Sequence, residues 1–374
     1  MKTKPIGLYL HIPFCVKKCN YCDFCSYPGL NQEIRGEYIS RLTKEILGYR
    51  REPKIPVDTV FFGGGTPSLL SPEEFSEICD AIDEAFEVVG DAEFTVEANP
   101  KTVNAEKLSA YISRGVNRIS LGLQTIHENE LKKLGRIHNF SDFIDAYNLV
   151  LESGITNVSV DIMYGIPEQT LDSFKDTLLA VLSLNPTHIS VYGLILEENT
   201  PLWNDRDNLR FPSEDEECDM YYLAASLLGE RGYSHYEISN YAKQGHRSRH
   251  NMKYWKTDDF IGVGVTAYSF FEGVRYGNLC DISEYISSDL KQYIKKEESN
   301  SSDLAFEYVM LGLRTSDGIS VEEYKRLFGT DFLSGRKEKI DRYIENGYMT
   351  VRGDCIALTE KGFYVSNTIL VDLL

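Results

Sequence analysis

Residues 6–22 read IGLYLHIPFCVKKCNYC, a short apolar run that leads directly into three closely spaced cysteines. Cys15, Cys19 and Cys22 have the spacing C-x3-C-x2-C, and Cys25 follows three residues later. Cysteine thiolates hold iron–sulfur clusters, so three of them in one loop can ligate three irons of a cubane [4Fe-4S] cluster. The fourth iron is then open and can chelate a substrate. This stretch therefore predicts a chemically active cluster at the end of a strand.

Two other uses of these cysteines stay open. A structural zinc site needs four ligands, and Cys25 could be the fourth. Zinc sites usually join two separated pairs of ligands, whereas here four sulfurs fall within eleven residues, which favours the cluster. A disulfide framework is disfavoured because the start of the chain, MKTKPIGLYL, has no apolar signal segment, and we expect a cytoplasmic protein. We expect Cys25 to be a buried thiol and the remaining cysteines to be small buried apolar residues: Cys79, Cys218, Cys280 and Cys355.

Composition narrows the class of protein. The chain has 374 residues, of which 42% are hydrophobic, so two or three domains are expected. A net charge of −18 opposes general nucleic-acid binding, which depends on lysine and arginine neutralising phosphates. No apolar run approaches the roughly 20 residues that a membrane-spanning helix needs, so the protein is not expected to be integral to a membrane.

Short β-rich runs alternate with helical stretches over the first half of the chain. The candidate strands are 6–10, 57–62, 92–97, 117–123, 156–163 and 187–194, and the candidate helices are 32–50, 72–88, 104–114, 127–135, 140–152 and 170–184. Repeated βα units imply parallel strands with helices outside. The pattern therefore predicts an α/β fold, either a partial (β/α)6 TIM-like barrel or a doubly wound sheet.

Special residues follow the ends of these strands. The second strand ends in Gly63-Gly64-Gly65, the third in Glu97, the fourth near Gln124 and the fifth in a run that begins with Asp161. Active sites of barrels gather at the carboxyl ends of the strands. Glycine backbone can approach a ligand closely, and a strand-end carboxylate can accept hydrogen bonds from hydroxyl or amino groups. Each residue alone also fits a turn or a surface position, but beside the cysteine loop they favour a ligand pocket.

The βα rhythm fades after residue 200. A helix is expected at 214–231, a strand near 260–264 and a charged, serine-rich linker or loop at 295–303. Helices at 304–314, 320–328 and 334–345, followed by strands near 348–358 and a last helix from Glu360, suggest a small winged-helix-like α+β domain. It holds 12 acidic and 9 basic residues over 303–374, which argues against reading DNA. The expected domains are 1–235, a connecting region 236–300, and 301–374.

Several segments together resemble the oxygen-independent coproporphyrinogen III oxidase family of radical S-adenosylmethionine (SAM) proteins. The resemblance is carried by YLHIPFC at 9–15 with Cys19 and Cys22, GGGTP at 63–67, EANP at 97–100, GLQT at 122–125, DIMYG at 161–165 and LTEKGF at 358–363. It implies a radical SAM barrel in which Cys15, Cys19 and Cys22 ligate the cluster and SAM occupies the open iron. It also implies a SAM pocket formed by Tyr9, Tyr21, Gly64, Gly65, Thr66, Glu97, Gln124, Arg136 and Asp161.

Within this family the chain resembles the heme chaperone branch, HemW, more closely than the oxidases. The oxidases carry an additional cysteine where Phe24 stands here, and a longer arm before Tyr9. The motif H-N-x-x-Y-W of the HemW branch is present at 250–255. The resemblance implies binding of the cluster, SAM and heme, transfer of heme to an acceptor protein, and an external electron donor as a further partner. The alternative is an oxidase that decarboxylates coproporphyrinogen III to protoporphyrinogen IX.

His250 opens the H-N-x-x-Y-W motif. An imidazole is a common axial ligand of heme iron, and Tyr254 and Trp255 could pack against a flat macrocycle. The residues alone favour a histidine satisfied by a backbone carbonyl among core aromatics. The resemblance makes His250 a candidate heme contact, with His246 as a weaker candidate.

Overall fold

The fold is built around six parallel strands in sequential order. The computed structural model describes residues 4–288, 293–298 and 300–374. The central strands are β1 (Ile6–Ile12), β4 (Ile55–Gly64), β5 (Phe86–Ala98), β6 (Arg118–Gln124), β7 (Asn157–Tyr164) and β8 (His188–Gly193), each parallel to the next. A doubly wound sheet would reverse its strand order at a switch point. The predicted partial (β/α)6 barrel is therefore confirmed, and the doubly wound alternative is wrong.

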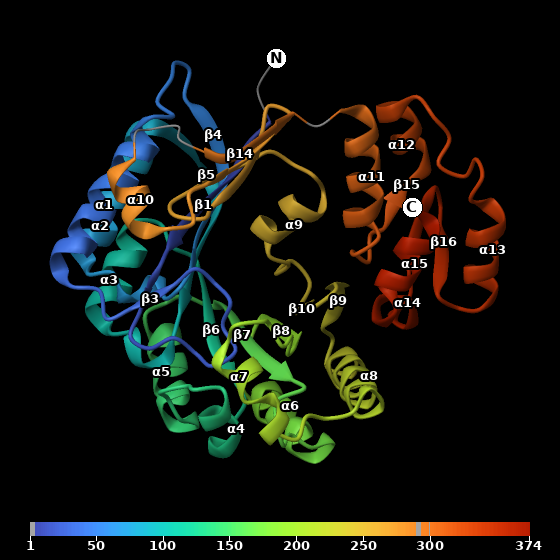
Figure 1. Cartoon of the computed structure of the whole chain (residues 1–374), viewed down its shortest axis with the longest axis horizontal. Coiled ribbons are helices and arrows are strands. Elements are labelled where there is room, and N and C mark those ends of the chain that lie inside the picture. The colour runs from blue at the N-terminus through green and yellow to red at the C-terminus, as the bar shows by residue number, and fades with distance from the viewer. Residues whose placement is uncertain (1–3, 289–292, 299) are drawn as a thin grey trace.

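Helices between these strands cover the outer face of the sheet (Figure 1). They are α1 (Gln32–Leu47), α2 (Pro72–Ala85), α3 (Ala105–Ser113), α4 (Glu128–Lys133), α5 (Phe140–Glu152) and α6 (Leu171–Leu184), with α7 (Pro201–Asn204) and α8 (Glu214–Glu230) following β8. Ser71 caps α2 through the backbone N–H of Glu74, whose carboxylate accepts from the Ser71 N–H. The helix predicted to reach residue 88 ends at Ala85, because Phe86 begins β5 and pairs with Ile55.

Alternation along the strands separates an apolar outer face from a polar interior. On β6, Ile119, Leu121 and Leu123 are fully buried in the core beneath the helices. The alternate positions on this strand, Arg118, Ser120, Gly122 and Gln124, face the barrel interior, because successive side chains of a strand point to opposite faces. The interior is therefore where polar groups can meet a ligand.

The region 236–300 contributes strands to the same sheet. The added strands are β9 (Ser234–Glu237), β10 (Asn240–Ala242), β11 (Phe260–Val263), β12 (Tyr268–Phe271), β13 (Val274–Asn278) and β14 (Tyr293–Glu298). The β11 strand pairs with β1 in parallel, and α9 (Arg249–Trp255) and α10 (Ile282–Ser287) lie between these strands in the chain. The linker predicted at 295–303 is wrong at both ends, because β14 reaches Glu298 and α11 begins at Ser301; residue 299 lies outside the described residues.

The C-terminal part packs around its own hydrophobic core beside the barrel (Figure 1). It consists of α11 (Ser301–Gly312), α12 (Val321–Phe328), α13 (Lys337–Glu345), α14 (Glu360–Tyr364) and α15 (Ser366–Leu373), with the antiparallel strands β15 (Ile319–Ser320), β16 (Met349–Arg352) and β17 (Cys355–Leu358). Helices followed by a β-hairpin confirm the predicted winged-helix-like arrangement. Among the described residues, no helix is both long and apolar enough to span a bilayer.

Cysteines outside the loop differ in burial. Cys79 is buried, as expected, and Cys218 and Cys355 are partly buried. Cys280 is exposed, so the prediction that it is a buried apolar residue is wrong. It lies in the turn between β13 and α10, where no helix covers it.

Candidate functional site

A cavity of about 310 Å³ opens at the carboxyl ends of the parallel strands. Its wall includes all three cysteines predicted to bind a cluster and eight of the nine residues predicted to bind SAM: Cys15, Cys19, Cys22, Tyr21, Gly64, Gly65, Thr66, Glu97, Gln124, Arg136 and Asp161. We call this space the outer cavity. Apart from the cysteine loop, the residues come from the strands β4, β5, β6 and β7 and from loops that follow β4 and α4, so the fold brings together positions that are up to about 150 residues apart in the chain.

The cysteine loop is held at both of its ends. The short strands β2 (Phe14–Cys15) and β3 (Tyr27–Pro28) pair in parallel, and the Tyr27 N–H donates to the Pro13 carbonyl at 2.7 Å. In the middle of the loop, the Asn20 N–H donates to the Leu134 carbonyl at 2.9 Å. Cys15, Cys19 and Cys22 are all free thiols and partly exposed. Burial raises the pKa of Cys15 and of Cys22 above the ordinary value.

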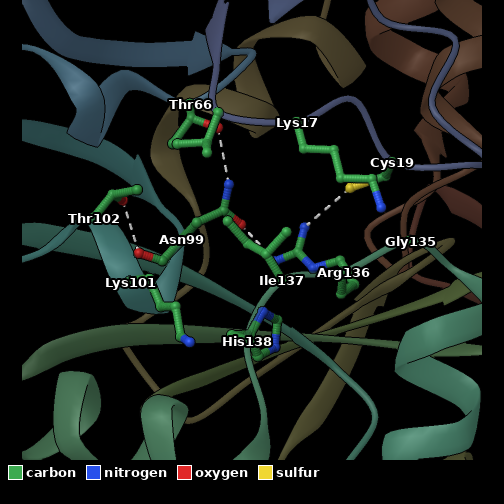
Figure 2. Close-up of a pocket in the computed structure, with 11 residues that line it drawn as sticks. Lys17, Cys19, Thr66, Asn99, Lys101, Thr102, Gly135, Arg136, Ile137 and His138 are labelled. Carbon is green, nitrogen blue, oxygen red and sulfur yellow. Dashed lines mark hydrogen bonds between the residues drawn. The ribbon is translucent and has the colours of Figure 1, made fainter. Parts of the chain in front are cut away.

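A chain of polar contacts joins Cys15 to Cys19, and Figure 2 shows the part of it that runs from Thr66 to Cys19. The Cys15 Sγ lies 3.6 Å from Thr66 Oγ1, which accepts from Asn99 Nδ2 at 2.8 Å. Asn99 Oδ1 accepts from Arg136, and the Arg136 guanidinium also reaches the Cys19 Sγ at 3.6 Å and the Gly122 carbonyl at 2.8 Å. Arg136 Nε is buried without a hydrogen-bond partner. The guanidinium thus retains a free donor beside the cavity.

Cys25 is oriented away from the other three cysteines. Its thiol donates to the Cys280 carbonyl at 3.4 Å and lies 3.6 Å from Tyr27 Oη. Cys25 is not among the residues that line the outer cavity. It is half-buried against the hydrophobic core, where burial raises the pKa of its thiol. The structure therefore separates Cys25 from the set that would have to include it in a four-cysteine zinc knuckle.

Two of the strand-end glycines are required by close packing against the cysteine loop. Gly64 has φ of +109°, and a Cβ there would lie 2.6 Å from the His11 ring. A Cβ on Gly65 would lie 2.8 Å from the Phe14 carbonyl oxygen, and its N–H donates to the Ile12 carbonyl at 2.8 Å. Glycine is needed at both positions because any side chain would push the loop away from the sheet. Both backbones still border the cavity.

Two partly buried carboxyl groups line the outer cavity. Glu97 accepts from the Gly64 N–H at 3.2 Å, and burial together with the nearby Asp161 charge raises the pKa of Glu97 to about 8. Asp161 accepts from the hydroxyls of Ser120 at 3.0 and 3.1 Å and of Ser159 at 3.2 Å. Burial raises the pKa of Asp161, and these hydroxyls oppose the rise. Both carboxyl groups can accept hydrogen bonds from a ligand in the cavity.

Gln124 ends β6 in a left-handed backbone conformation. Its φ is +70°, and the residue is 7% exposed. Glutamine rarely adopts this conformation, which costs about 1 kcal/mol or more. The unusual backbone directs its side chain toward the cavity that it lines. Strain at such a position favours a ligand contact over a simple turn.

Tyr9 and His250 do not reach the outer cavity. Both line a second space inside the barrel, of about 210 Å³, which we call the inner cavity. His250 is 1% exposed, with Nδ1 2.8 Å from Thr59 Oγ1 and Nε2 2.7 Å from Tyr254 Oη. Both ring nitrogens are therefore in use, through side-chain hydroxyls instead of a backbone carbonyl. His246 lines neither cavity.

The sequence analysis missed several residues of the outer cavity. Asn99 bridges Thr66 and Arg136, and the wall also includes Ser120, Met163 and Tyr192. A signal for three of them exists in the two-residue alternation, since Ser120 lies four positions before Gln124, Met163 two after Asp161, and Tyr192 faces inward on β8. Their roles in binding, like those of the predicted site residues, stay predictions.

The residues present fit a cluster and SAM. In the described parts of the chain, no three cysteine, histidine, aspartate or glutamate side chains are arranged to bind a single metal ion. The three thiols instead line a cavity, as the ligands of a larger cluster would. Thiolates suit iron, while the glycine backbone, the two carboxyl groups and the free donor of Arg136 offer complementary contacts to the amino, hydroxyl and carboxylate groups of SAM.

Comparisons with known proteins identify the family of the chain. The Radical SAM superfamily matches residues 9–181, and the HemN C-terminal domain matches residues 300–365. The heme chaperone HemW of Lactococcus lactis is 35% identical, over 99% of this chain and 97% of its own, and that of Escherichia coli is 34% identical, over 99% and 98%. Among solved structures, the coproporphyrinogen III oxidase HemN from Escherichia coli has a TM-score of 0.85 at 22% identity, covering 99% of this chain and 90% of its own, which supports the fold alone.

Proposed function

Because this chain belongs to the HemW family of heme chaperones within the radical SAM superfamily, we propose that it holds a [4Fe-4S] cluster, SAM and heme, and passes the heme to an acceptor protein. The observation that supports this most directly is the outer cavity. Three free thiols at the spacing of one cluster border it together with eight residues suited to SAM. The cluster, when bound, supplies an electron-transfer centre with an iron open to SAM.

The protein's own residues divide this work. Cys15, Cys19 and Cys22 would hold the cluster, and the Arg136 contact to Cys19 places positive charge beside those sulfurs. The carboxyl group of Glu97 would accept hydrogen bonds from the amino and ribose groups of SAM, the glycine backbone of Gly64 and Gly65 would let it approach closely, and Arg136 would pair with its carboxylate. Glu97 can hold a proton near neutral pH, since its pKa is raised to about 8. Tyr21, Thr66, Gln124 and Asp161 complete the proposed pocket.

The heme contact is proposed at the H-N-x-x-Y-W motif on α9. His250 is the candidate iron ligand, and it would have to exchange its contact with Tyr254 or Thr59 for the iron. The acceptor protein and an external electron donor are further proposed partners, and the proposed location is the cytoplasm. We also propose the division into 1–235, 236–300 and 301–374, which rests on the separate core of the C-terminal part.

Hemin binding and SAM-dependent decarboxylation, measured on one anaerobically reconstituted preparation, test this proposal. We expect a Soret band on adding hemin and no conversion of coproporphyrinogen III to protoporphyrinogen IX with SAM and a reductant. Conversion would make the protein an oxidase, and absence of hemin binding would remove the chaperone function.

The role of His250 needs a matched control. His250→Ala should weaken hemin binding, whereas His188→Ala should not. His188 lines the same inner cavity and is also buried, with its nitrogens 2.8 Å from Ser159 Oγ and Tyr236 Oη. If both variants lose hemin equally, the effect of His250→Ala comes from packing and not from an iron contact.

A further inference from the structure

The inner cavity is lined by a buried arginine that is not paired directly with any carboxylate of the described residues. Arg118 lies on the inward face of β6 and is 2% exposed. Within the described residues, no hydrogen bond or ion pair reaches its side chain, and its Nε is buried without a partner. An unpaired buried charge is strongly unfavourable. Such a charge is retained where a ligand of opposite charge supplies the missing partner.

The neighbouring carboxyl groups do not take that role. Asp161 accepts hydrogen bonds from the hydroxyls of Ser120 and Ser159, and the Arg118 charge lowers the pKa of Asp161 without a direct contact. Glu97 accepts from the Gly64 N–H and, with its pKa raised to about 8 by burial and by Asp161, is mostly neutral at pH 7. Neither contacts the Arg118 guanidinium within hydrogen-bond distance in the described structure. The Arg118 guanidinium therefore keeps hydrogen-bond donors free in the cavity, although the nearby carboxyl groups interact with its charge.

Size and lining indicate the chemistry of that anion. The inner cavity measures about 210 Å³, several times the roughly 30 Å³ that one water occupies in the liquid. Hydroxyl groups of Ser190, Tyr192 and Tyr254 line it and can donate to an oxyanion. A guanidinium matches a carboxylate with two parallel hydrogen bonds. The space suits a carboxylate on a short aliphatic arm and is too small for a macrocycle.

The cavity also connects the two proposed ligand regions. Glu97, Ser120, Asp161 and Tyr192 line both cavities. His250, Asn251 and Tyr254 of the H-N-x-x-Y-W motif line the inner one. A carboxylate arm that reaches Arg118 can therefore belong to a ligand at the motif or to one in the outer cavity.

We propose that the inner cavity is a carboxylate-binding site in which Arg118 pairs with the carboxylate of a short aliphatic arm. This rests on the proposed function, because two of its ligands carry such an arm: heme has propionates, and SAM has one amino-acid carboxylate, which would then pair with Arg118 instead of Arg136. The site differs from the contact proposed for Arg136, which borders the outer cavity beside Cys19.

Paired ligands with and without free carboxylates test the site in the full-length, reconstituted protein. We expect Arg118→Met to weaken binding of hemin or of SAM at least tenfold. The same variant should bind hemin dimethyl ester and decarboxylated SAM as wild type does. Arg118→Lys should restore part of the affinity. The ligand that loses affinity identifies the source of the carboxylate.

Two further measurements guard against a purely structural effect. Arg118→Met without ligand should unfold at the same temperature as wild type or higher, because it removes an unpaired buried charge. In the wild type, sodium propionate should compete with hemin or SAM, which needs no variant. The matched control is Arg275→Met, which removes a partly buried arginine paired with Glu307 at 2.6 Å outside both cavities.

The proposal is overturned if Arg118→Met binds all four ligands as wild type does, or if each free acid and its blocked partner lose affinity equally. If wild type binds neither hemin nor SAM, the proposed function fails instead. Propionate alone then tests the inner cavity. The measurement is the change in melting temperature that sodium propionate causes in wild type and in Arg118→Met. An equal effect on both would overturn the site.

Discussion

The two ends of the barrel interior differ in how their polar groups are satisfied. At the carboxyl ends of the strands, three thiols are free and Arg136 keeps an unpartnered Nε. At the opposite end, near Gly7 and Thr59, the His250 ring has a partner at each nitrogen. Unsatisfied groups around a space are typical of a ligand site, and a completed network is typical of a structural contact. The outer end presents several free groups to an occupant, whereas at the opposite end α9 completes the His250 network and leaves Arg118 without a hydrogen-bond partner.

The largest effect should come from the cysteines themselves. Changing Cys15, Cys19 or Cys22 to serine should remove nearly all iron and inorganic sulfide, because each thiolate would hold one iron. Cys25→Ser should keep both at the wild-type level, since its thiol contacts Cys280 and Tyr27 outside the cavity. Metal and sulfide analysis of anaerobically reconstituted protein checks this. Equal loss in Cys25→Ser, or stoichiometric zinc without sulfide, would contradict the division between the cysteines.

The next largest effect is expected from His250, at the end of the barrel opposite the cysteines. His250→Ala removes two hydrogen bonds and leaves a cavity, so the free energy of unfolding should fall by about 3 kcal/mol. Urea denaturation without heme measures it. The control His246→Ala changes a partly exposed residue and should stay within about 0.5 kcal/mol of wild type. A loss under about 1 kcal/mol in His250→Ala would mean that α9 does not depend on this network.

The pH dependence of stability tests the raised pKa of Glu97 in the outer cavity. The pKa of Glu97 is about 8 in the folded protein and 4.5 in the reference state. Between these values the folded protein holds a proton that the unfolded chain releases, so its contribution to stability is full below about pH 4.5 and is lost as pH rises through 8.

Wild type should therefore lose roughly 3.5 kcal/mol relative to Glu97→Gln between pH 5 and 8. Urea denaturation across this range measures the difference. The exposed control Glu106→Gln should follow wild type at every pH. Parallel curves for wild type and Glu97→Gln would show that Glu97 titrates as an ordinary carboxyl group.

The smallest effect concerns backbone strain beside the cavity. Gln124→Gly should raise stability by about 0.5 kcal/mol, because relief of left-handed strain slightly exceeds the entropy cost of glycine. The same change should weaken SAM binding severalfold, as calorimetry can measure. Asn199→Gly, at a φ of +67° outside the cavity, should leave SAM affinity unchanged. Unchanged SAM affinity in Gln124→Gly would make the strain unrelated to the ligand.

Local patterns predicted most of the barrel. The six parallel strands and the helices between them fall where alternation and capping place them, as at Ser71 before α2. The errors occur where a distant partner decides the structure. Phe86 leaves the helical pattern because it pairs with Ile55, and residues 293–298 form a strand because β13 offers an edge to pair with. A charged sequence does not reveal such an edge.

Most residues of the candidate site were also predicted from the sequence. Strand-end residues such as Glu97 and Asp161 do meet in one cavity, because parallel strands place their carboxyl ends at one edge. Tyr9, which the resemblance assigns to the SAM pocket, lines the inner cavity and not the outer one. It sits in the middle of β1, three positions before the strand ends, and the sequence pattern does not give the depth of a side chain in a barrel.

The sequence by itself determined the cysteine loop and the βα order, because both depend on spacing along the chain and on the two-residue period of a strand. Only the tertiary structure decided which polar groups are satisfied. The partner of His250 at Thr59 is 191 residues away, and Arg118 is buried without a partner although its sequence neighbours are ordinary strand residues. Hydrogen bonds and desolvation are set by contacts in space, so the charge left unpaired inside the barrel becomes visible only after folding.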